Sequence, residues 1–167
     1  MNRTITILSL AVIIYSCQKS EKIVNGDEVT KINDLCCYKS DSSLFTGIIT
    51  DSFGSGFQNY EYRYKEGKED GFSKEWYANG NQKALINYVD GEIDGLEKDF
   101  YETGQLKFEI SYKNGSFDGF SKGWYANGNQ KFILNNHGQL RDQDFDPRSL
   151  HDSLSSEMEW NEDGSLK

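Results

Sequence analysis

The sequence predicts an all-β protein: a single-layer, curved, antiparallel meander of 24-residue β-hairpin repeats. Three observations predict it. Glycines recur in one register, at Gly47, Gly71, Gly95 and Gly119. Turn dipeptides return twice in each unit, and apolar side chains alternate with polar ones between the turns. A period of this length is typical of repeat arrays, and no segment requires a helix.

Each unit divides into two short strands because turn signals of two kinds alternate. The turns within units are Asn79-Gly80, Thr103-Gly104 and Asn127-Gly128, and those between units are Glu66-Gly67, Asp90-Gly91, Asn114-Gly115 and His137-Gly138. Asn-Gly and Asp-Gly favour the positive φ angles of tight hairpins. Neighbouring strands should therefore pair in sequence order.

The alternation predicts two unlike faces. The second strands place apolar residues on one face, namely Tyr60, Tyr62, Tyr64, Ala84, Ile86, Tyr88, Phe108, Ile110, Tyr112, Phe132 and Leu134. Their other face is mainly polar and includes Lys83, Leu85 and Asn87. In the first strands, Phe72, Lys74 and Trp76 should share a face, as should their counterparts one and two units later. Stacked units then form ladders of like side chains.

Five segments organise the 167 residues, which suit one domain with an appendage. We predict an export signal at 1–16, a lipidated tether with a possible first strand at 17–43, four repeats at 44–140, an acidic insertion at 141–159 and a half-repeat at 160–167. The possible strand runs through residues 34–39.

The N-terminus has the features of an export signal. Arg3 precedes the apolar run from Ile5 to Tyr15, which is too short to span a bilayer. Ser16-Cys17 then resembles a bacterial lipoprotein processing site, which implies acylation of Cys17 and a place in the cell envelope, on the periplasmic or surface side. The alternative is a plain signal peptide with an incidental cysteine.

Two stretches, residues 71–83 and 119–131, share the pattern Gly-Phe-Ser-Lys-x-Trp-Tyr-Ala-Asn-Gly-Asn-Gln-Lys. This pattern resembles the MORN-repeat variant family, also labelled YwqK-like antitoxins. The resemblance covers roughly residues 44–140 and the half-repeat. It implies a curved sheet of hairpins that serves as a scaffold or binding surface, and it supplies no catalytic residue.

Composition and candidate motifs argue against other chemistry. A net charge of −9 disfavours nucleic acid as a partner. His137 occupies a turn position, and His151 stands beside Asp152 without a site around it. The residues from Asp142 to Asp146 have the acidic spacing of a calcium loop, but Pro147 stands where its glycine is needed. We therefore predict no enzyme activity, no metal and no cofactor.

Cys36 and Cys37 are adjacent in the sequence. A disulfide between neighbours is strained, because their Cα atoms lie about 3.8 Å apart. Free thiols are the preferred interpretation, and a regulatory disulfide is the alternative.

An aromatic row is the candidate binding surface: Trp76, Phe100 and Trp124, with Tyr77, Tyr101 and Tyr125 on the reverse face. Such residues bind protein or sugar when exposed; alternatively, one set belongs to the core and the other forms a half-exposed ladder. The leading hypothesis is a lipid-anchored envelope protein that binds or scaffolds another protein. The alternatives are an antitoxin or immunity protein that neutralises a toxin, and a carbohydrate-binding module.

Overall fold

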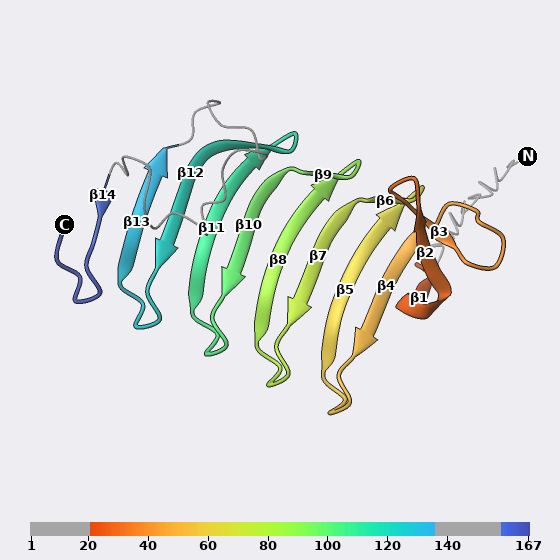
Figure 1. Cartoon of the computed structure of the whole chain (residues 1–167), viewed down its shortest axis with the longest axis horizontal. Helices are drawn as coiled ribbons and strands as arrows, with labels where there is room; N and C mark the ends of the chain where they lie inside the picture. Colours follow the sequence, from red (N-terminus) through yellow and green to blue (C-terminus); the bar gives the residue numbers. More distant parts are fainter. Residues whose placement is uncertain (1–20, 136–157) are drawn as a thin grey trace, which may run out of the picture.

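The computed structural model describes residues 21–135 and 158–167, and these residues form the strands of a repeat sheet (Figure 1). One short 3-10 helix, η1 (Gly26–Glu28), follows the first strand. The strands are β1 (Ile23–Asn25), β2 (Val29–Ile32), β3 (Leu35–Tyr38), β4 (Gly47–Ser52), β5 (Gln58–Lys65), β6 (Lys68–Glu69), β7 (Gly71–Trp76), β8 (Gln82–Val89), β9 (Glu92–Ile93), β10 (Gly95–Phe100), β11 (Leu106–Lys113), β12 (Ser116–Trp124), β13 (Gln130–Asn135) and β14 (Met158–Glu159).

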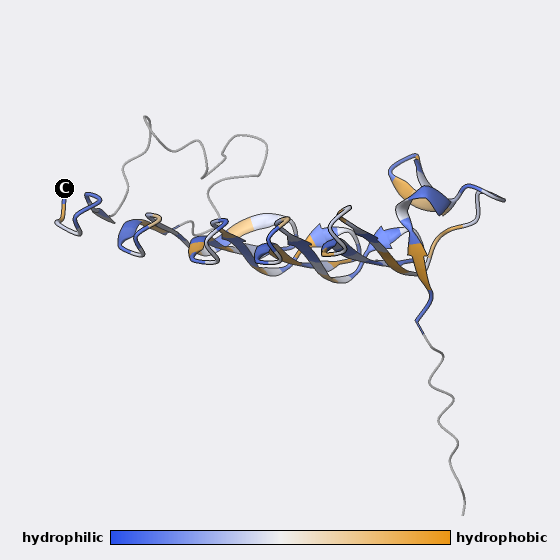
Figure 2. Ribbon diagram, turned by 90° about the horizontal axis from the view of Figure 1, so that it is seen from below, coloured by the Kyte–Doolittle hydropathy of each residue, from blue (hydrophilic) through white to orange (hydrophobic). Residues whose placement is uncertain are grey.

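The main sheet is open and one layer thick, as predicted (Figure 2). Its strands follow the order β1-β4-β5-β7-β8-β10-β11-β12-β13-β14, with β6 paired to β5 and β9 paired to β8. All these pairings are antiparallel except that of β1 with β4. Each unit thus adds two strands to the sheet, and the half-repeat at 160–167 follows β14, which pairs with β13 of the same chain.

The two kinds of turn differ in backbone geometry, and they lie at opposite ends of the strands (Figure 1). Between units, both turn residues have positive φ, as in Asp90 (53°) and Gly91 (89°), which is the geometry of a two-residue type I′ hairpin. Within units, only the glycine has positive φ, and the amide of Gly80 donates to the carbonyl of Tyr77. The Asn-Gly pairs inside the units therefore close a longer loop than a two-residue turn.

A bulge recurs at each junction between units. Tyr64 pairs with Glu69, whereas Glu61 pairs with Lys74, so β6 and β7 together contain two more residues than the facing stretch of β5. The extra residues include Gly71, whose φ of +98° suits glycine. The bulge explains why one glycine marks the start of every unit.

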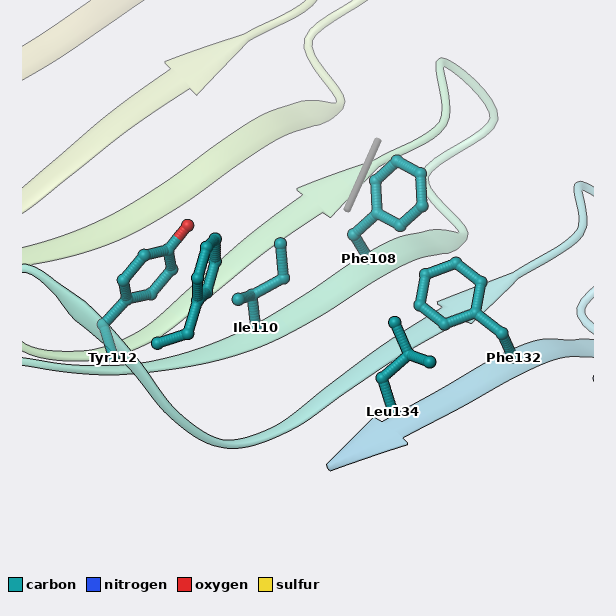
Figure 3. Close-up of a cluster of buried hydrophobic side chains, with 6 residues drawn as sticks. Phe108, Ile110, Tyr112, Phe132 and Leu134 are labelled. Carbon is teal, nitrogen blue, oxygen red and sulfur yellow. The ribbon is translucent and has the colours of Figure 1, made fainter. Parts of the chain in front are cut away.

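The predicted apolar columns form one face of the sheet, which we call the aromatic face. It contains the residues of the second strands given above, from Tyr60 to Leu134. Six neighbours are buried together near its C-terminal end: Phe108, Ile110, Tyr112, Phe117, Phe132 and Leu134. Figure 3 shows the rings of Phe108 and Phe132 side by side, and their centroids are 6.1 Å apart. The prediction of these columns is confirmed.

The N-terminal segment is folded where we expected mostly a tether. The amide of Ile48 donates to the carbonyl of Lys22, and β1 pairs with β4. Strands β2 and β3 form a separate two-stranded sheet on one side of the main sheet (Figure 2). Val24, Val29, Cys36, Phe45 and Ile49 are buried as one cluster that includes residues of both sheets. We call residues 21–46 the N-terminal cap.

A further bulge lies at the turn end of the hairpin of β7 and β8. Glu75 pairs with Ala84 and Trp76 pairs with Gln82, so β8 contains one extra residue, Lys83. The Lys83 ammonium group pairs with the Glu75 carboxylate at 2.7 Å. Glu75 pairs with Ala84 of the aromatic face. Lys83 therefore reaches that face rather than the polar one.

Several predicted features lie outside the described residues. They are the processing site at Cys17, both histidines and most of the acidic insertion. Cys36 and Cys37 lie within β3, and both thiols are free and buried. Burial and the neighbouring Cys37 raise the pKa of the Cys36 thiol, which keeps it protonated at neutral pH.

Candidate binding face

The predicted aromatic row lies where the strands enter the turns, and its tyrosines connect one unit to the next. All six side chains are half-buried. The Tyr77 hydroxyl donates to the Phe100 carbonyl, Tyr101 to Trp124 and Tyr125 to Trp160, each at 2.8 Å. This tyrosine ladder gives half of the row a structural role. A binding role for the row stays a prediction.

Asparagine side chains add hydrogen bonds between units at the same ends of the strands. Asn79 and Asn81 both donate to the Glu102 carbonyl, at 2.9 Å. Asn127 and Asn129 repeat this arrangement on the Glu162 carbonyl, at 2.7 and 3.0 Å. The Asn-Gly-Asn sequence thus shapes its own turn and also binds the following one. This second use was not apparent from a turn propensity.

The tyrosine ladder should be measurable as stability. We expect Tyr101→Phe to lower the free energy of unfolding by about 0.5–1.5 kcal/mol, because the Trp124 carbonyl loses its donor. Urea denaturation measures the change. Tyr38→Phe is the matched control, since no hydroxyl bond of Tyr38 occurs among the described residues, and it should change stability less. Equal effects of the two changes would contradict a structural role for the ladder.

The aromatic face also carries carboxylates from the first strands. Glu75 accepts hydrogen bonds from the Tyr62 hydroxyl at 2.6 Å and from Lys83 at 2.7 Å. Burial acts to raise the pKa of Glu75, but these two donors outweigh it and lower the pKa. Burial and Glu75 raise the pKa of Tyr62 far above its usual range. This group is a satisfied ionic contact within the fold and not an acid poised for proton transfer.

Glu69 differs, because burial raises its pKa and Lys31 only partly opposes that. A carboxyl with a raised folded pKa destabilises the fold above that pKa, and the cost disappears as pH falls to the unfolded value of about 4.3. We therefore expect Glu69→Gln to raise the melting temperature at pH 7. The gain should shrink on acidification toward pH 4, as followed by thermal melts across pH. A gain that is constant with pH would contradict this assignment.

The opposite side of the main sheet, which we call the lysine face, has two rows that run across the strands. In the first row, an exposed apolar residue occurs in each of three units: Phe72, Leu96 and Phe120, with 50%, 42% and 45% exposure. The second row runs beside it, two residues further along each strand. It contains Lys74, Lys98 and Lys122, each paired across the sheet with another residue of this face.

Charge on the lysine face differs from that of the whole chain. Lys98 and Lys122 share the carboxylate of Glu109, at 3.3 and 3.5 Å. Lys74 lies 3.9 Å from Glu61, which also pairs with Arg63. The three lysines and Arg63 thus stand beside Glu61 and Glu109, and Arg63 also pairs with Glu21, although the whole chain carries −9. Exposed pairs of this kind contribute little stability, so the lysines remain available to a partner.

The described residues lack two other functional features. Among them, no group of three or more His, Cys, Asp or Glu side chains could hold a metal ion. Within residues 21–135 and 158–167, no helix is long and apolar enough to cross a membrane.

An open, single-layer β-sheet of stacked hairpins defines a repeat protein. Residues 93–114, from the end of β9 to the turn after β11, match the family model of the MORN repeat variant. The neighbouring units share the strand and turn pattern of this matched segment, so the sheet resembles an array of such repeats. Comparison with curated proteins and with solved structures gives no significant match.

Sequence reasoning identified the residues of the lysine face but not their exposure. Phe72 and Lys74 were assigned to one face, and the period of the repeat supplies their counterparts. The candidate surface was instead the aromatic row from Trp76 to Tyr125, because aromatic residues exposed on a sheet can bind sugar or protein. A single-layer sheet has two candidate surfaces, and only the structure shows which apolar residues are exposed.

Proposed function

We propose that this protein is a lipid-anchored, non-enzymatic envelope protein that binds another protein through the lysine face. Proteins built from MORN repeats are generally binding modules without catalytic activity. The observation that carries the proposal is the exposed row of Phe72, Leu96 and Phe120, repeated at the same position of three units. Grouped apolar residues with a polar border are typical of protein interaction surfaces.

The anchor belongs to the same proposal. An acylated Cys17 would stand four residues before Glu21, which pairs with Arg63 at 2.7 Å. Four extended residues reach about 14 Å at most, so the sheet would be held close to the bilayer. The partner is therefore expected in the membrane or directly beside it.

Capture from membranes tests the binding role. Tagged full-length protein is crosslinked in cells, recovered from the membrane fraction and compared with Leu96→Asp by quantitative mass spectrometry. Ile32→Asp in the N-terminal cap is the matched control, because Ile32 is 40% exposed and Leu96 is 42% exposed. We expect one stoichiometric protein that Leu96→Asp depletes and Ile32→Asp retains. A protein recovered equally with all three chains would contradict binding through the lysine face.

The anchor is tested by Cys17→Ser. Without the thiol, no acyl chain can be attached, so we expect the protein to leave the membrane fraction and to lose incorporation of a labelled fatty acid. Full retention in membranes, with labelling unchanged, would show that Cys17 is not the site of lipidation.

A further inference from the structure

The two rows of the lysine face have the spacing of a helical ligand. Adjacent strands lie about 4.8 Å apart, and each unit adds two strands, so equivalent residues of successive units are about 9.6 Å apart. An α-helix rises about 10.5 Å in seven residues. We propose that the lysine face binds an acidic amphipathic α-helix that crosses the strands. This inference rests on the proposed function and specifies the partner.

In this arrangement, one helical residue in seven contacts the first row. Apolar side chains would lie over Phe72, Leu96 and Phe120, whose half-exposed side chains leave apolar surface to cover. The accumulated mismatch over two steps is about 2 Å, which long side chains accommodate. Burial of this surface supplies the main favourable free energy of binding.

The second row determines the charge of the helix. Its lysines lie two strand residues, or about 6.7 Å, from the apolar row. A helix with its side chains is about 10 Å across, so residues four positions after each apolar contact reach the second row. Among the described residues, Lys98 and Lys122 share one carboxylate, that of Glu109. Acidic residues at these positions of the ligand would complete the pairing.

The end of the face at β1 and β4 offers a place for one more contact. A shallow pocket of about 410 Å³ lies there, lined by residues that include Ile23, Ile48 and Glu61. Glu61 pairs with Lys74 across the sheet, so the pocket continues the second row. A residue of the helix about two turns, or about 10.5 Å, beyond the contact with Phe72 would reach this pocket.

Extended ligands fit the two rows less well. In a β-strand, residues on one face repeat at about 6.7 or 13 Å, and neither distance matches the spacing of the units. A polyproline II segment repeats at about 9.3 Å but projects its other side chains at roughly 120°. Such a segment can follow the apolar row, but it does not place carboxylates over the lysines.

The test uses full-length protein in detergent micelles and a designed, labelled peptide. The peptide is a stable helix of about 22 residues, with leucine at every seventh position and glutamate four positions after each leucine. Fluorescence anisotropy gives its affinity. We expect Leu96→Asp to weaken binding at least about tenfold and Lys98→Glu to weaken it several-fold. Ile32→Asp and Lys39→Glu, both in the N-terminal cap, should leave affinity within about twofold.

Two control peptides and anionic lipid vesicles decide the outcome. A peptide of the same composition whose leucines do not repeat in sevens, and one with lysine in place of glutamate, should bind at least about tenfold more weakly. Equal binding of either peptide would overturn the inference, as would binding of anionic phosphatidylglycerol vesicles to the lysine face without peptide binding. If membranes yield a protein through Leu96 but the helical peptide does not bind, the proposed function stands and the helical ligand is wrong.

Discussion

We expect Phe45→Ala to lower the free energy of unfolding by about 3–5 kcal/mol. Phe45 is fully buried, and its ring contacts Tyr38 and Tyr64 edge-on, with centroids 5.1 and 6.1 Å away. Tyr38 belongs to the N-terminal cap, and Tyr64 belongs to the main sheet. Truncation leaves a cavity at the point where the two sheets join, so the cap should detach at lower denaturant concentration.

Urea denaturation followed by far-ultraviolet circular dichroism measures this change. Phe72→Ala is the control, since Phe72 is half-exposed on the lysine face and surface changes usually stay within about 0.5 kcal/mol. A loss below about 1 kcal/mol for Phe45→Ala would indicate that the N-terminal cap does not contribute to the stability of the sheet.

The second large effect is expected at Gly123, which pairs with Phe132 on the aromatic face. A Cβ atom at Gly123 would lie only 2.4 Å from the Phe132 ring. In the corresponding place two units earlier, Glu75 pairs with the small Ala84. We therefore expect Gly123→Glu to cost about 1–3 kcal/mol, because the new side chain has to displace the Phe132 ring.

A double-mutant cycle separates this clash from other effects of the substitution. Phe132→Ala alone should also cost several kcal/mol, since the Phe132 side chain is buried. The double variant copies the Glu75–Ala84 pair and should be more stable than the sum of the two losses predicts, by about 1 kcal/mol or more. Additive losses in thermal and urea denaturation would contradict complementarity of size between these two positions.

Much of this fold could be predicted from the sequence, because the same pattern of residues occurs in each repeat. The glycine register, the apolar columns of the second strands and the pairing of hairpins in sequence order all follow from local signals. The turns between units were also predicted to be tight hairpins with positive φ, and Asp90-Gly91 has this geometry. Repetition strengthens each of these signals, since independent copies agree.

Other features depend on contacts between distant residues and could not be predicted. The polar residues around Asn25 show no strand periodicity, yet β1 forms because an edge strand of the main sheet accepts it. The shift before Trp76 makes Lys83 an extra residue of β8, and the alternating pattern of the strand does not mark it. The role of Tyr101 was missed because its acceptor is a backbone carbonyl of the next unit.

Because the sheet has a single layer, the sequence left two faces as possible binding surfaces. Both faces carry aromatic or apolar columns in the sequence, and hydrophobicity alone does not show which column is exposed. The structure separates them by exposure: Leu96 is half-exposed, whereas the Tyr101 hydroxyl is used within the sheet. The structure also places lysines beside the exposed row. The net charge of −9 for the whole chain does not reveal this local positive charge.

The most direct measurement of the central claim is site-specific photo-crosslinking in cells. A photoreactive residue replaces Leu96 on the lysine face or, in a separate chain, Ile32 in the N-terminal cap, with each full-length protein at the same membrane level. We predict one discrete protein adduct from position 96 and none of that mass from position 32. An adduct of the same protein from position 32 alone, or no protein adduct from position 96, would contradict binding through the lysine face.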